Sequence, residues 1–228
     1  MYRVFLWLLL STAWLLSACT QQSTPQSDTV ASAGESAQAG SDGLEPRTSH
    51  LDAVSAAFAL DLSGARVYVA PVQIDYTKRF STLPRRPYRE KDYELDTSDL
   101  QRLNELLAQT FADKFLSARN GELVSDPTGA DYTLALSMER FSLAAPLEPS
   151  PWTWRVYTEQ SAYGVLVGTL FDREGNVVMR FRDRRDIGEN FGSLRPGGRL
   201  ERFTSITFWS DMRVDMRRAF ASLDKSLL

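Results

Sequence analysis

Few residues of this sequence have the chemistry that catalysis requires. Cys19 is the only cysteine and His50 the only histidine among 228 residues. His50 has no defined partner to orient it as a base, and zinc sites need several His or Cys ligands. A pair of carboxylates could hydrolyse a glycan, but 29 Asp and Glu residues give no basis for choosing two. We therefore expect no catalytic residue, no metal site and no cofactor, and an enzyme is the least favoured class of function.

Cys19 predicts another kind of chemistry, because it follows a signal-like segment. Residues 1–3 carry one positive charge, and residues 4–16 form an apolar run. A membrane span needs about 20 apolar residues, so this run predicts a signal peptide over 1–18. Leu16-Ser17-Ala18-Cys19 resembles the lipobox of bacterial lipoproteins, in which the cysteine thiolate takes a diacylglyceryl group. We expect Cys19 to carry lipid, palmitate included.

The residues after Cys19 predict where the lipid holds the protein. Thr20, rather than Asp, follows the cysteine, which by resemblance to the sorting pattern favours the outer membrane. Residues 19–46 are rich in Ser, Thr, Gln, Ala and Gly, so they predict a flexible tether. Residues 47–228 are expected to form a single α/β domain that faces the periplasm. The formal net charge of −3 lacks the basic footprint of a nucleic-acid binder.

Arginine and aromatic side chains gather in three segments without a strand or helix pattern, over 75–97, 144–161 and 186–202. These residue types dominate the binding energy of protein interfaces, and the neighbouring prolines reduce the entropy lost on docking. We expect the segments to bind an envelope protein. Trp152 and Trp154 could instead fold back as a lid over the sheet. The candidate binding residues are Arg85, Arg86, Tyr88, Trp152, Trp154, Tyr157, Arg195 and Arg199.

Three further arginines alternate along one predicted strand. Arg180, Arg182 and Arg184 share one face of that strand. They could line a groove for an anionic envelope glycan or lipid, such as peptidoglycan or lipopolysaccharide. The alternative, which we favour, is a solvated face on which these arginines pair with Glu139 and other acids.

Apolar periodicity predicts the elements that position these residues. Period-2 patterns and continuous apolar runs predict strands over 66–74, 132–141, 162–171 and 176–184. Helical stripes predict one helix from Ser98, with Gln101 in a capping box, to Asn120-Gly121, and another over 204–227. Residues 49–52 predict the start of a short helix with Leu51, Val54 and Phe58 on one face.

The order β-α-β-β-β-α predicts a two-layer α/β sandwich. Strands that are apolar on one face require cover on that face alone, so we expect a mixed four-stranded sheet with two helices on one face. The first β-α-β unit makes its two strands parallel, and a tight hairpin at 172–175 reverses the chain once more. All three long segments then reach the same edge of the sheet, and the tether enters at the opposite edge.

Three segments carry a family resemblance. They are RVYVAPVQI (66–74), ELVSDPTGADYTLALSME (122–139) and VGTLFDREGNVVMRFRDRRDIG (167–188), and a closing helix with Trp209 near its start also fits. Over residues 60–228 the chain resembles an uncharacterised family of Gram-negative outer-membrane lipoproteins, known only as a domain of unknown function. The resemblance implies a fold and a location, and it brings no activity or catalytic residue.

Overall fold

The computed structural model describes residues 43–77, 90–148, 156–189 and 200–227, which all belong to one compact unit. Within these ranges eight strands form one mixed sheet, in the order β1-β2-β9-β8-β6-β3-β5, with β4 beside β6. The strands are β1 (Leu44–Pro46), β2 (Ala53–Ala57), β3 (Arg66–Val69), β4 (Gln73–Tyr76), β5 (Glu122–Val124), β6 (Tyr132–Leu143), β8 (Ala162–Asp172) and β9 (Val177–Ile187). A second, two-stranded sheet pairs β7 (Tyr157–Thr158) with β10 (Glu201–Arg202).

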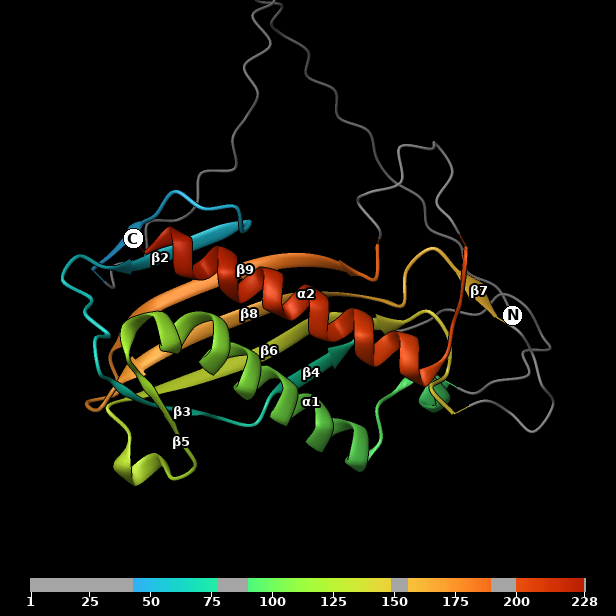
Figure 1. Cartoon of the computed structure of the whole chain (residues 1–228), viewed down its shortest axis with the longest axis horizontal. Coiled ribbons are helices and arrows are strands. Elements are labelled where there is room, and N and C mark those ends of the chain that lie inside the picture. Colours follow the sequence, from blue (N-terminus) through green and yellow to red (C-terminus); the bar gives the residue numbers. More distant parts are fainter. Residues whose placement is uncertain (1–42, 78–89, 149–155, 190–199, 228) are drawn as a thin grey trace, which may run out of the picture. The chain divides into compact units, whose positions relative to one another are not determined.

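Both long helices cover the same face of the large sheet (Figure 1). The first, α1 (Thr97–Phe111), continues through a π turn (Ala112–Leu116) and a 3-10 turn (Ser117–Arg119); the second is α2 (Ser205–Ser226). Their apolar stripes are buried against the sheet. The predicted two-layer α/β sandwich with two helices on one face is confirmed. In the part of the chain that the structure describes, no helix is long and apolar enough to cross a membrane.

The sheet contains more strands than the four that periodicity predicts. The predicted strand over 66–74 is two strands, β3 and β4, which both run parallel to β6. Pro71 lies in the break between them and has no N–H to donate. Before the break, the N–H of Ala70 still donates to the carbonyl of Leu134 in β6. After it, the N–H of Val72 leaves the ladder and donates to Asn104 Oδ1 of α1 at 2.6 Å.

The predicted short helix after Ser49 is wrong, because residues 53–57 form the strand β2. This strand pairs with β9, and β1 pairs with β2, so the sheet begins within the segment expected to be tether. Val54 is buried as expected, but Phe58 is 80% exposed. A helical face would bury both residues, whereas a strand that ends at Ala57 leaves Phe58 outside the core.

The helix ends also differ in part from the prediction. The N-cap of α1 is Asp96, whose carboxylate accepts a hydrogen bond from the N–H of Asp99 at 2.8 Å. The expected capping box of Ser98 and Gln101 does not form, since Gln101 donates to Glu105. Asn120 ends the helical run in the left-handed conformation, as predicted. For α2, the predicted range of 204–227 matches its two caps, Thr204 and Leu227.

The predicted alternation along β6 is confirmed up to Met138 and is interrupted at Arg140. Leu134, Leu136 and Met138 are buried on the helix-covered face. Arg140 has a φ of +51°, and the register against β8 shifts there. The shift lets Phe141 and Leu143 face the core as well. One extra residue therefore extends the covered face of the strand to its end.

Candidate functional site

Strand register brings the flanks of the three long segments to one edge of the sheet. Tyr76 lies opposite Phe141, Leu143 opposite Ala162, and Ala162 opposite Ile187. Strands β4, β6 and β9 therefore end, and β8 begins, at this edge, which we call the loop edge. The opposite edge contains the turn at 172–175 and is called the hairpin edge. The predicted convergence of the segment ends is confirmed for the described flanking residues.

The chain enters the fold at the hairpin edge. Leu44, the first residue of β1, lies opposite Ala57, and Ala56 lies opposite Met179, near the start of β9. Gly43, the first described residue, is thus at the hairpin edge. The predicted entry of the chain opposite the loop edge is confirmed for the domain itself.

Exposed apolar side chains surround the small β7–β10 sheet at the loop edge. Tyr157 lies opposite Arg202, and the N–H of Phe203 donates to the carbonyl of Val156 at 2.8 Å. Tyr157 is 52%, Leu200 57% and Ile206 82% exposed. Tyr157 is a predicted site residue, whereas sequence reasoning missed Leu200 and Ile206. Ile206 falls outside the buried stripe of α2, and this position in the sequence predicts its exposure.

The other predicted site residues lie outside the described residues. They are Cys19, Arg85, Arg86, Tyr88, Trp152, Trp154, Arg195 and Arg199. Their roles stay predictions, and so does the choice between a tryptophan lid and a tryptophan binding surface.

Hydrogen bonds to α2 fix two of the segment flanks. The hydroxyl of Ser161 donates to Asp211, and the N–H of Gly188 donates to Asp215 Oδ2 at 2.9 Å. Asp215 is buried, and burial raises the pKa of Asp211. Gly188 has a φ of +85°, and a Cβ on it would lie 2.5 Å from Asp211 Oδ2, so glycine is required there. The loop edge around β8 and β9 is therefore attached firmly to the helix layer.

A tyrosine fixes the first segment on both sides. The N–H of Leu95, just before α1, donates to the hydroxyl of Tyr76 at the end of β4, at 2.9 Å. The Tyr76 ring packs edge-on against Phe141, with ring centroids 5.9 Å apart. Burial raises the pKa of Tyr76, which keeps its hydroxyl neutral. The flanks of 78–89 are thus tied to each other and to the core.

The arginines of β9 are only in part available to a ligand. Arg182 pairs with Glu139 of β6 at 2.7 Å, which confirms the expected partner. The main-chain N–H of Arg184 donates to Asp52, and its side chain is exposed. The pair shared by Arg182 and Glu139 occupies the middle of the proposed anion groove, so a solvated, paired face describes this strand better.

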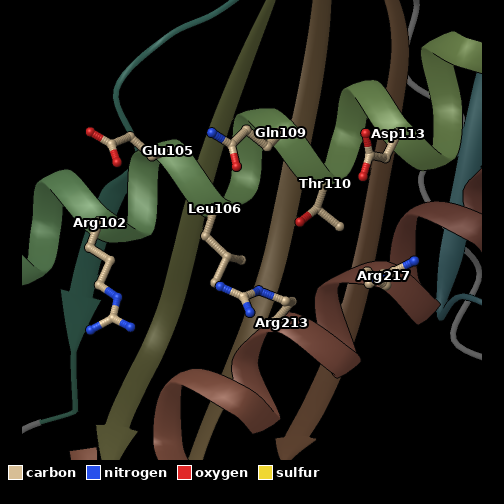
Figure 2. Close-up of a pocket in the computed structure, with 8 residues that line it drawn as sticks. All are labelled: Arg102, Glu105, Leu106, Gln109, Thr110, Asp113, Arg213 and Arg217. Carbon is tan, nitrogen blue, oxygen red and sulfur yellow. The ribbon is translucent and has the colours of Figure 1, made fainter. Parts of the chain in front are cut away.

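The described residues contain no group of three or more His, Cys, Asp or Glu side chains placed to hold a metal ion. His50 is exposed. A polar groove lies between α1 and α2 (Figure 2), and another hollow borders Asp131 and Arg173 at the hairpin edge. In the second hollow, Asp131 is already bonded to Arg66 and Arg173.

No protein-family model and no curated protein matches this chain. Solved structures with a similar arrangement include a PelC dodecamer from Paraburkholderia phytofirmans, at 13% identity over 78% of this chain and 96% of that chain, with a TM-score of 0.37. A DUF330 protein from Xanthomonas campestris has 12% identity, coverages of 78% and 90%, and a TM-score of 0.35. A DUF4136 protein from Bacteroides thetaiotaomicron has 10% identity, coverages of 79% and 98%, and a TM-score of 0.33. At these identities the likeness concerns the fold alone.

Proposed function

We propose that this chain is a lipid-anchored interaction module of the outer membrane, which faces the periplasm and binds an envelope protein through its loop edge. One observation carries the proposal: the flanks of three long segments converge at one edge, where Tyr157, Leu200 and Ile206 are exposed. Aromatic and large apolar side chains on a firmly attached edge favour protein recognition, because little conformational freedom is lost on docking.

The entry point of the chain supports this orientation. Gly43 lies at the hairpin edge, so a lipid anchor on Cys19 would present the loop edge away from the bilayer. We include in the proposed surface the arginine and aromatic residues predicted from the sequence, which lie outside the described residues. Binding of an anionic glycan or lipid by the β9 arginines is the weaker alternative, because Glu139 already pairs with Arg182.

Site-specific photo-crosslinking in cells tests the proposal. A photoreactive amino acid replaces Tyr157, Leu200 or Ile206, each in turn, and Phe58 provides the matched control because it is as exposed as Ile206 but follows β2 at the hairpin edge. We expect a discrete crosslinked partner from the loop-edge positions and none from Phe58. Ile206→Ser should weaken crosslinking from Tyr157, whereas Phe58→Ser should not.

Two results would contradict this function. The first is the same set of adducts from Phe58 as from the loop edge, which would indicate general stickiness. The second is the absence of any adduct from all three loop-edge positions in cells that produce the folded protein.

A further inference from the structure

The groove between α1 and α2 lies on the helix layer, apart from the surface assigned above to a protein partner. Its volume is about 230 Å³. In Figure 2, Arg102 and Thr110 extend from α1 towards α2, and Arg213 extends from α2 towards α1. The lining is polar, with three guanidinium groups and two carboxylates, which leave one net positive charge.

Two of these guanidinium groups are uncommitted. Arg213 and Arg217 are one helical turn apart, so both face the same side of α2. Both are exposed, and neither forms an ion pair with any residue that the structure describes. By contrast, the neighbouring Arg218 pairs with Asp215. The groove therefore contains donors that the fold itself does not use.

The third guanidinium is held in place by an aromatic ring. Arg102 lies over the ring of Trp209, 4.6 Å from its centroid. Trp209 is buried, so it provides a fixed platform. A cation–π contact leaves the N–H groups at the rim of the guanidinium plane free to donate.

A threonine hydroxyl faces the same groove. Thr110 is only 6% exposed, but its Oγ1 is not among the described buried side-chain atoms that lack a hydrogen-bond partner, so solvent in the groove reaches the hydroxyl. Figure 2 shows the hydroxyl of Thr110 directed into the space between the helices, on the side of Arg213. A ligand in the groove can therefore accept a hydrogen bond from this hydroxyl in place of water.

The carboxylates of the groove are not placed to accept a hydrogen bond from Thr110. Glu105 accepts a hydrogen bond from Gln101 at 3.0 Å and points away from α2 in Figure 2. Asp113 lies in the π turn that follows α1, beyond Thr110, and forms no ion pair with Arg213 or Arg217 within 4.0 Å among the described contacts. It should repel an anion bound beside Thr110.

We propose that this groove binds a phosphate-type oxyanion, with Arg102 and Arg213 as guanidinium donors, the Thr110 hydroxyl as a third donor and Arg217 adding charge. Guanidinium forks match the geometry of phosphate oxygens and form strong charge-assisted hydrogen bonds. The phosphate group could belong to a lipid headgroup or to a free phosphate compound, and both present the same oxygens to these donors.

Isothermal titration calorimetry on the full-length protein in a neutral detergent tests the site. The two probes are inorganic phosphate and dihexanoyl phosphatidic acid, at low salt because salt screens the attraction. We expect saturable binding of at least one probe. Arg213→Gln should weaken it about tenfold or more, the effect of one lost charge-assisted hydrogen bond. Arg184→Gln is the matched control, with the same charge change on the opposite face of the sheet, and should leave affinity unchanged.

Asp113→Asn separates a specific site from a loss of structure. Removal of the carboxylate should raise affinity several-fold, a gain that misfolding would not produce. Binding of both probes would assign recognition to the phosphate group alone, and binding of the lipid alone would assign the source to a headgroup. Absence of saturable binding by either probe, or an equal loss in Arg184→Gln and Arg213→Gln, would overturn the proposal.

Discussion

Gly168 provides the sharpest test of how the sheet fits the helix layer. It lies in β8 directly opposite Phe181 of β9, and a Cβ at this position would sit 2.2 Å from two carbons of the Phe181 ring. The ring cannot move freely, because it packs edge-on against Phe220 of α2 with centroids 6.3 Å apart. The phenyl ring thus occupies the space that the glycine leaves open.

Gly168→Ala should therefore lower the free energy of unfolding by about 2 kcal/mol. Overpacking a core costs about 1–3 kcal/mol, and disturbing the contact of Phe181 with Phe220 adds about 0.5–1.5 kcal/mol. Replacing glycine by alanine by itself stabilises the fold by about 0.5–1 kcal/mol, because glycine loses more conformational freedom on folding. Urea denaturation followed by circular dichroism would show the loss as a midpoint lowered by about 1 M, for a slope near 2 kcal/mol per M.

Gly164→Ala is the matched control on the same strand. A Cβ there would lie 2.9 Å from Met138 Cε, the end of a flexible side chain, and 3.2 Å from Phe141 Cδ2. Because a small shift relieves both contacts, we expect a loss below about 1 kcal/mol. In a Phe181→Leu background, Gly168→Ala should become nearly neutral, with a coupling energy of about 1 kcal/mol or more. Equal losses at Gly164 and Gly168, or strict additivity with Phe181→Leu, would refute the reasoning.

Two other predictions concern pH and the lipid anchor. Burial raises the pKa of Asp211, repulsion from Asp215 and Glu201 adds to this, and the hydrogen bond from Ser161 opposes it. A carboxyl whose pKa is raised by folding destabilises the fold once ionised, so stability should fall as pH rises from about 4 through the folded-state pKa. Asp211→Asn should reduce this fall of stability with pH. An unchanged dependence of stability on pH would count against the raised pKa of Asp211. The proposed lipid on Cys19 would hold the protein through buried acyl chains, so Cys19→Ser should release it from the membrane fraction into the soluble fraction. Retention in the membrane fraction after fractionation and immunoblotting would disprove lipid anchoring.

Strong periodicity made the long elements predictable. The range of α2 follows from its buried stripe of Trp209, Met212, Met216 and Phe220, and β6 follows from its alternation. The short strands β1, β2 and β5 have three to five residues and little pattern, so pairing with neighbours decides their conformation. For Phe58 the apolar pattern is misleading. An apolar residue after an alanine-rich run is typical of a core position, yet Phe58 is exposed.

The candidate sites also contain features that the sequence predicts and features that it does not. Convergence at the loop edge follows from the order and direction of the strands, which the sequence reveals. Leu200 was missed because a single apolar residue has no periodic signature, and Ile206 is marked only by its place outside the buried stripe of α2. For the groove, the spacing of Arg213 and Arg217 is visible in the sequence. The facing of Thr110 towards α2 depends on how two distant helices pack, which no local pattern encodes.

The entry of the chain at the hairpin edge has a mechanical consequence. Tension between Gly43 and a partner held at the loop edge would run along the strands. Hydrogen bonds between antiparallel strands lie perpendicular to them, so the ladders from β1 through β2 to β9 would be loaded in shear. In shear, many bonds must break together, whereas a perpendicular load would peel them one at a time. The strand order thus orients these ladders to resist force along the axis from the point of entry to the loop edge.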